Sequence, residues 1–137
     1  MCIRDSLYWK SAYPKFGENA VWLDGRNKNP FFKPTLEDMQ RLKEKGIDII
    51  APPIPVLVRT VENGELALSD YARFAKSVGL RIMTWTFESY RVNNAVYSET
   101  PGRMLEVLDF LSEEVGVIGI FSDWPGTVTY YANCMAR

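Results

Sequence analysis

Aromatic and carboxylate side chains follow two short apolar segments of this sequence, residues 80–86 and 117–121. The side chains at or just after the ends of these segments are those of Trp85, Thr86, Phe87, Glu88 and Asp123. If both segments are parallel strands of one sheet, their carboxyl ends lie at the same edge, which is where α/β barrels bind their substrates. We therefore predict that Trp85, Thr86, Phe87 and Asp123 contact a substrate.

Some of these residues also have other possible roles. Glu88 and Asp123 at one edge would suit acid–base hydrolysis of a glycoside or ligation of a hard cation. Asp123 also precedes Trp124-Pro125, where a carboxylate can accept hydrogen bonds from the backbone N–H groups of a turn. Glu88 is otherwise expected to be a solvated loop charge. Trp85 could instead fill the core, since large aromatic side chains dominate cores.

The signals for phosphate or metal binding are weaker. Arg26, Lys28 and Lys33 could contact a phosphate, but nothing in the pattern orients them, and exposed basic side chains are usually only solvated. Gly-rich phosphate loops and metal-binding histidine spacings are absent from the sequence. Pro52-Pro53 ends another predicted strand, where its fixed φ and missing donors favour a rigid exit turn or the floor of a pocket.

The composition excludes several kinds of function. The 137-residue chain contains no histidine, the usual acid–base group at neutral pH and the commonest metal ligand. We therefore predict no catalytic residue and no metal ligand in it. A net charge of -1 with mixed signs argues against nucleic acid as a partner. No apolar run approaches the roughly 20 residues of a membrane span, so we expect no transmembrane segment.

Helical and strand patterns alternate after Pro34. Helices are predicted over about 35–45, 69–78 and 100–115, each is stopped by a glycine, and each is followed by an apolar strand at 47–51, 80–86 or 117–121. A last helix is predicted over about 127–135. Strands that are separated by helices are parallel. The predicted fold class is therefore α/β, with three parallel βα units and a terminal helix, which leaves a strand edge unpaired.

The two strand ends together resemble a known family. One strand ends in Trp85-Thr86, and some thirty to forty residues later the next strand ends in Gly119-x-x-Ser122-Asp123-x-Pro125. This pair resembles the closing units of the glycerophosphodiester phosphodiesterase family, and the likeness covers most of residues 35–137. The resemblance implies a TIM-type (β/α)8 barrel that cleaves glycerophosphodiesters to glycerol 3-phosphate and an alcohol with a divalent metal ion, calcium or magnesium.

The resemblance also implies roles for this chain. The matching tryptophan of the family packs on the apolar part of the substrate, which would be the role of Trp85. The family's His-Arg, Glu-x-Asp, second histidine and mid-barrel glutamate have no counterpart here. Since a whole barrel needs about 250 residues, we expect a C-terminal portion of the barrel, inactive alone, whose partner is the missing N-terminal part. A carboxylate-driven barrel hydrolase and a non-catalytic half-barrel binding module stay open as alternatives.

The first 34 residues are expected to lie outside the regular fold. Residues 1–6 lack a folding pattern and back-translate onto a sequencing-library adapter, so we interpret them as a cloning or assembly scar. Residues 7–34 are rich in aromatic and turn residues and hold at most a short strand at 20–23. They resemble the insertion in the larger, often periplasmic, bacterial branch of the family, which suggests a periplasmic or secreted protein.

Overall fold

The computed structural model describes residues 21–24, 26, 29, 31–88 and 103–135. The predicted scar at 1–6, most of the predicted insertion at 7–34, and Lys28 lie outside the described residues. So does the predicted start of the third helix at Thr100-Pro101.

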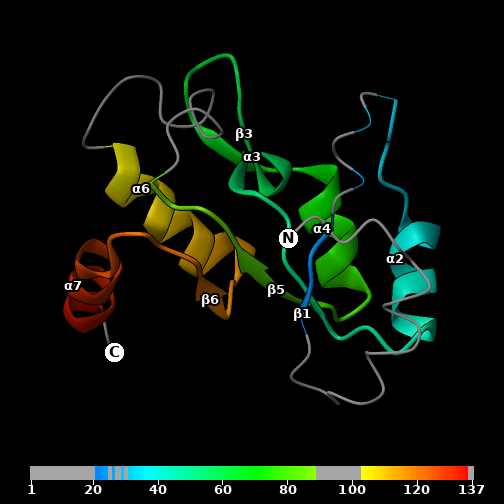
Figure 1. Ribbon diagram of the computed structural model, residues 1–137. Helices are drawn as coiled ribbons and strands as arrows, with labels where there is room; N and C mark the ends of the chain where they lie inside the picture. Colours follow the sequence, from blue (N-terminus) through cyan, green and yellow to red (C-terminus); the bar gives the residue numbers. More distant parts are fainter. Residues whose placement is uncertain (1–20, 25, 27–28, 30, 89–102, 136–137) are drawn as a thin grey trace.

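A parallel sheet of four strands forms the centre of the described structure (Figure 1). Its strands are β1 (Val21–Trp22), β2 (Ile49–Ile50), β5 (Arg81–Thr84) and β6 (Gly119–Ile120), in the order β1-β2-β5-β6. The predicted α/β class with parallel strands is confirmed. The short strand expected at 20–23 is present and pairs with β2, so the sheet has one strand more than the three repeating units supply.

Helices separate the strands along the chain. They are α2 (Leu36–Glu44), α4 (Asp70–Ser77), α6 (Arg103–Phe110) with its π-helical continuation η3 (Leu111–Val115), and α7 (Pro125–Met135). Figure 1 shows α2 and α7 at opposite sides of the structure. The predicted stop glycines Gly46, Gly79 and Gly116 all have φ between 71° and 83°, a conformation that glycine adopts without strain.

The predicted starts of the first two helices are also present. Thr35 Oγ1 accepts a hydrogen bond from the Asp38 N–H at 3.1 Å, and an Asp38 carboxylate oxygen accepts one from the Thr35 N–H at 3.2 Å. This reciprocal capping box fixes the start of α2. Ser69 caps the start of α4, because its hydroxyl oxygen accepts a hydrogen bond from the Ala72 N–H at 3.1 Å.

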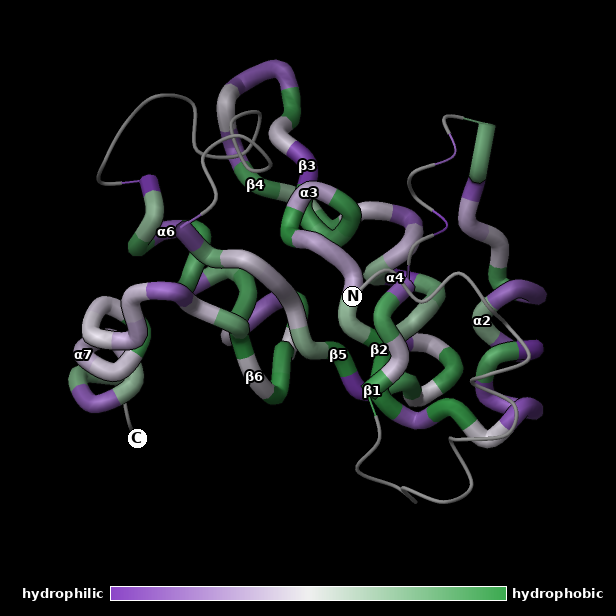
Figure 2. The backbone as a smooth tube through the Cα atoms, in the orientation of Figure 1, coloured by the Kyte–Doolittle hydropathy of each residue, from purple (hydrophilic) through white to green (hydrophobic). Residues whose placement is uncertain are grey.

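A hairpin that the sequence analysis did not predict lies between β2 and α4. It follows a short helix α3 (Ile54–Leu57) and consists of the antiparallel strands β3 (Val58–Thr60) and β4 (Leu66–Leu68). Figure 2 shows the hairpin as hydrophilic at its tip, away from the sheet. Pro52-Pro53 therefore ends β2 as predicted but leads into this excursion before the next βα unit begins.

The core lies between the sheet and the helices. Alternate strand residues such as Ile50 and Ile82 pack with Met39 of α2, Tyr71 of α4 and Leu108 of α6, all at most 2% exposed. By contrast, α7 has no buried residue, and only Val128 and Tyr131 pack partly against the core. No helix among the described residues is long and apolar enough to cross a membrane.

Candidate functional site

The carboxyl ends of β2, β5 and β6 are joined beyond the strands themselves. The pairing of β2 with β5 continues through a parallel bridge between Pro53 and Trp85. On the other side, the Phe121 N–H donates to the Thr84 carbonyl at 2.8 Å, and the Phe87 N–H donates to the Phe121 carbonyl at 3.0 Å. The predicted site residues at the ends of β5 and β6 are therefore brought to one edge of the sheet.

Trp85 is fixed to the neighbouring strand end. Its indole N–H donates to the Ala51 carbonyl at 2.7 Å, just after β2, and the side chain is half-buried. Strand alternation places Trp85 on the same side of β5 as Met83 and opposite the buried Ile82 and Thr84. Part of the Trp85 side chain stays accessible just after the end of β5.

Thr84, Thr86 and Phe87 occupy three different environments at this edge. The Thr84 hydroxyl is buried and donates to the Pro52 carbonyl at 2.9 Å. Thr86 is half-buried. Phe87 is 0% exposed and belongs to the hydrophobic core, so its side chain has no surface on which a substrate could lie. Of the three predicted substrate contacts that follow β5, only Trp85 and Thr86 keep exposed surface.

Glu88 connects the end of β5 to the turn after β6. One of its carboxylate oxygens accepts a hydrogen bond from the Ser122 hydroxyl, and the other accepts one from the Asp123 N–H at 2.8 Å. The Trp124 N–H in turn donates to the Ser122 hydroxyl oxygen at 3.2 Å. Glu88 is half-buried, and it is not the freely solvated loop charge that one interpretation of the sequence expected.

The electrostatics of Glu88 follow from these contacts. Partial burial acts to raise the pKa of the carboxyl, but the hydrogen bonds from Ser122 and from the backbone N–H groups outweigh it. The net pKa of Glu88 therefore lies below its ordinary value, because these donors favour the ionised form.

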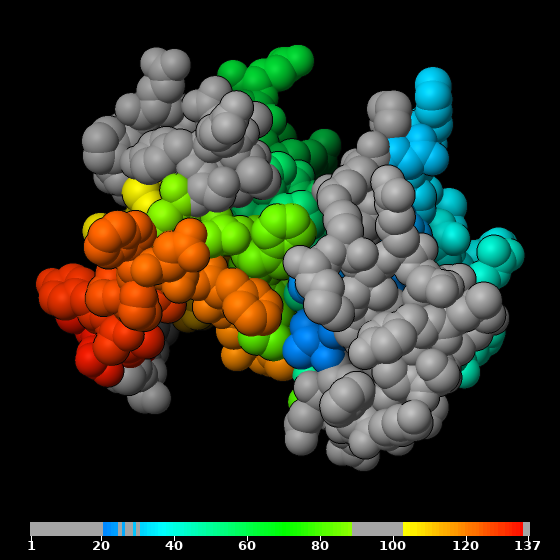
Figure 3. Space-filling model, in the orientation of Figure 1, coloured from blue at the N-terminus to red at the C-terminus, as the bar shows by residue number. Residues whose placement is uncertain are grey.

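Asp123 lies on the exposed side of the same turn. Among the described residues, the hydrogen bonds that hold the turn run to Glu88 and Ser122 rather than to the Asp123 carboxylate. Trp124 is 73% exposed. The turn thus presents both side chains to its surroundings, and Figure 3 shows this orange segment directly against the green end of β5.

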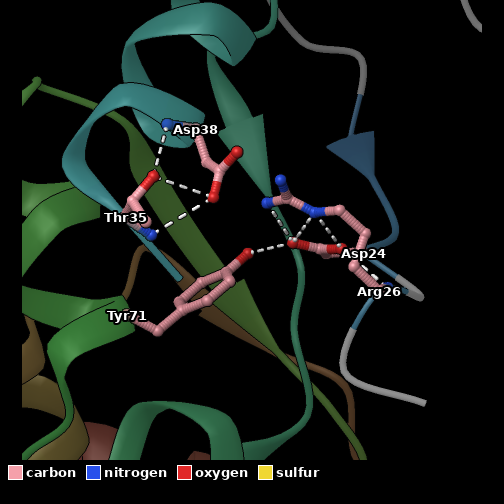
Figure 4. Close-up of polar contacts among 5 residues, drawn as sticks. All are labelled: Asp24, Arg26, Thr35, Asp38 and Tyr71. Atoms are coloured by element: carbon pink, nitrogen blue, oxygen red, sulfur yellow. Dashed lines mark hydrogen bonds and ion pairs between the residues drawn. The ribbon is translucent and has the colours of Figure 1, made fainter. Parts of the chain in front are cut away.

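A second carboxylate site, which the sequence analysis missed, follows β1. Asp24 is 2% exposed and accepts hydrogen bonds from Arg26 at 2.8 Å and from the Tyr71 hydroxyl at 2.6 Å (Figure 4). Arg26 also lies over the rings of Trp22 and Phe32, at 5.2 and 4.7 Å from their centroids. The only sequence signal for this cluster is that Asp24, like Glu88, follows a short apolar run.

The cluster shifts the ionisation of its members. Burial raises the pKa of Tyr71 well above its ordinary value, and the charge of Asp24 adds to the effect. Burial acts to lower the pKa of Arg26, but its bonds to Asp24 outweigh this and the net pKa is raised. Arg26, expected as a possible phosphate contact, is thus neutralised by Asp24, while Lys33 is exposed.

Two pockets lie in other parts of the structure than the predicted substrate contacts at the carboxyl ends of β5 and β6. One of about 390 Å³ adjoins Tyr71, and its lining residues include Phe32, Val56 and Arg59. The other, of about 300 Å³, is lined by residues of α6, η3, β6 and α7. Neither is lined by Trp85 or Asp123. Across the part of the chain that the structure describes, no group of three or more His, Cys, Asp or Glu residues is placed to hold a metal ion.

Comparison with known proteins gives one informative similarity. No family model matches the chain. A protein of Arthroderma benhamiae named "Extracellular protein" is 32% identical to it over 146 residues, covering 96% of this chain and 60% of that protein. The chain therefore spans somewhat less than two thirds of the length of this relative.

Proposed function

We propose that this chain forms the C-terminal part of a TIM-type barrel of the glycerophosphodiester phosphodiesterase kind. The whole protein would hydrolyse glycerophosphodiesters to glycerol 3-phosphate and an alcohol. The observation that carries the proposal is the junction of β5 and β6. The two segments that resemble the family, Trp85-Thr86 and Gly119 to Pro125, lie at one sheet edge and are joined there through Glu88.

The barrel part of the proposal rests on topology. Four parallel strands stand in the sheet in the order in which they occur along the chain, which is the arrangement of a barrel wall. Among the described strands, β6 has a partner on one side only. The chain spans 60% of the extracellular relative, and its 137 residues are a little more than half of the about 250 residues of a whole barrel.

In the proposal, the reacting groups belong to other parts of the whole protein. Both oxygens of Glu88 already accept hydrogen bonds, and the described residues offer no cluster of metal ligands. The described residues therefore do not fit a metal site of their own. In the proposal, the ligands of the calcium or magnesium ion and the proton-transferring histidines lie outside these 137 residues, and Trp85 and the 122–125 turn bind substrate.

The alternative of a glycoside hydrolase that uses Glu88 and Asp123 is disfavoured by the same contacts. A general acid at neutral pH needs a raised pKa, whereas the pKa of Glu88 is lowered by its donors. The name of the Arthroderma relative, "Extracellular protein", supports a secreted location, which we include in the proposal.

The test is hydrolysis of glycerophosphocholine by the intact natural protein. We expect release of glycerol 3-phosphate that requires calcium or magnesium and stops when the metal is chelated. Glu88→Gln and Asp123→Asn variants are assayed in parallel for sugar release from glycosides. Loss of sugar release in these variants, with hydrolysis of glycerophosphocholine unaffected, would favour the glycoside hydrolase instead. A folded intact protein that releases no glycerol 3-phosphate with either metal would refute the proposed function.

A further inference from the structure

We propose that Glu88 is a positioning residue, which holds the Ser122–Asp123–Trp124 turn against the end of β5 so that this turn forms one wall of the substrate pocket. The inference rests on the proposed function for the identity of the substrate. The contact itself is independent of that function, because it is a property of the fold.

The turn needs an external support. It lies between β6, a strand of two residues, and α7, a helix that buries none of its residues. The core contacts α7 through the partly buried Val128 and Tyr131, and the Tyr131 hydroxyl also donates to Asp109 of α6 at 2.8 Å. With so little packing on its C-terminal side, the position of the turn depends on hydrogen bonds to its other neighbour, the end of β5.

Glu88 supplies these hydrogen bonds just beyond the backbone hydrogen bonds that join the ends of β5 and β6. A backbone bond between the two strand ends runs from the Phe87 N–H to the Phe121 carbonyl at 3.0 Å. The next residue on each strand is bound by a side chain instead, because the Glu88 carboxylate accepts from the Ser122 hydroxyl. Its second oxygen reaches one residue further, to the Asp123 N–H at 2.8 Å. We call this set of contacts the β5–β6 clamp.

The clamp orients side chains that it does not contact directly. The Asp123 N–H is directed at Glu88, and Asp123 and Trp124 are both exposed. Trp85 lies at the same edge, fixed from the opposite side by its bond to Ala51. The end of β5 is thereby tied to both neighbouring strand ends, and the exposed turn and Trp85 keep a constant relative position. An aromatic or apolar part of a substrate that touches both would depend on that position.

The decisive experiment measures KM and kcat for glycerophosphocholine in the intact protein. Glu88→Ala is expected to raise KM about tenfold and leave kcat within about twofold, since the reacting groups lie elsewhere and only binding is loosened. Glu88→Gln keeps one acceptor oxygen and should restore KM to within about threefold of the unchanged protein. Glu62→Ala, at an exposed position in the β3–β4 hairpin, is the matched control and should change neither constant.

A merely structural role predicts a different pattern. Loss of folded protein would lower the apparent kcat and leave KM unchanged, and this result for Glu88→Ala would overturn the inference. Ser122→Ala provides a check through a double-mutant cycle. Its effect on KM should be much smaller in the Glu88→Ala background, because both changes remove the same contact.

Hydrogen exchange separates this inference from the proposed function. In Glu88→Ala, backbone amides in a peptide covering residues 119–125 should exchange about tenfold faster, with no change in the peptide that contains β2. Unchanged exchange would refute the clamp whatever the activity. Faster exchange in a protein that never hydrolyses glycerophosphodiesters would support the clamp and refute the substrate role proposed for it.

Discussion

At the carboxyl edge of the sheet, β1 and β5 are both followed by a carboxylate, and the two carboxylates have different surroundings. Asp24, after β1, is the only buried charged side chain among the described residues, and it accepts from a guanidinium and a phenol. Glu88, after β5, is half-buried and accepts from a hydroxyl and a backbone N–H. A carboxylate that is removed from water needs a countercharge, whereas one that keeps contact with water is satisfied by neutral donors.

The difference shows what a strand-end carboxylate does in each place. Asp24 joins the loop after β1 to α4 through Tyr71 and contributes to the packing of the fold. Glu88 joins two strand ends where aromatic side chains remain exposed. The position after a strand is the same, so the partners, and not the position, decide whether such a residue belongs to the interior or to a candidate binding edge.

The largest effect that tests this comparison is expected from Asp24→Ala. It leaves the partly buried Arg26 guanidinium and the buried Tyr71 hydroxyl without their partner, and it should lower the free energy of unfolding by about 3–5 kcal/mol. Glu88→Ala should cost only about 1 kcal/mol, because water can replace the lost hydrogen bonds. Urea denaturation of the intact protein measures both. Equal losses in the two variants would contradict the contrast between the two strand ends.

A smaller effect is expected from Tyr71→Phe, which removes one hydrogen bond to Asp24 and should cost about 1.5–3 kcal/mol near pH 8. Tyr71 also predicts a pH dependence. Its pKa is raised in the folded protein by burial and by Asp24, whereas in the unfolded chain it is about 10. Above pH 10 the unfolded state therefore loses a proton that the folded state keeps, and stability falls as the pH rises toward the raised pKa.

The measurement is the urea midpoint between pH 8 and pH 11 in the unchanged protein and in Tyr71→Phe. The urea midpoint of the variant should be lower at pH 8 and should fall less steeply above pH 10, because the buried phenol is absent. If both proteins lose stability with the same slope, Tyr71 does not titrate differently in the two states and the Asp24 cluster is less closed than its geometry indicates.

The sequence predicted the parts of the fold that depend on local chemistry. The helix stops at Gly46, Gly79 and Gly116 and the capping box of Thr35 and Asp38 were all visible as short-range patterns. The β3–β4 hairpin was missed although its turn carries a local signal, because Asn63-Gly64 stands between two short strand-forming runs and Gly64 has the positive φ of 84° that such a turn requires.

The site was less predictable because its contacts are long-range. Ser122 and Glu88 are 34 residues apart, and Tyr71 and Asp24 are 47 apart, so no local pattern identifies either pair. Phe87 was predicted to contact substrate from its place after a strand. Alternation distinguishes the two sides of a strand but not which side the core occupies, and in the structure Phe87 belongs to the core.

Trp85→Phe is expected to have an effect of intermediate size. The change keeps an aromatic ring but removes the indole N–H that donates to Ala51, which should cost about 1 kcal/mol of stability. The same variant tests the two roles considered for Trp85. A higher KM for glycerophosphocholine supports a substrate contact, whereas a loss of stability with KM unchanged would assign Trp85 to the support of the sheet edge alone.

The smallest effect is expected from the protonation of Glu88 at low pH. Its pKa is lowered in the folded protein, so its contribution to stability is present above the unfolded pKa of about 4.3 and is lost as the pH falls through the lower folded value. Because the group is partly exposed, solvent screening keeps this contribution small. Comparing urea midpoints between pH 6 and pH 3, Glu88→Gln should lose less stability on acidification than the unchanged protein. Parallel curves would mean that Ser122 and Asp123 do not favour the ionised carboxylate, and burial alone would then distinguish the two strand ends.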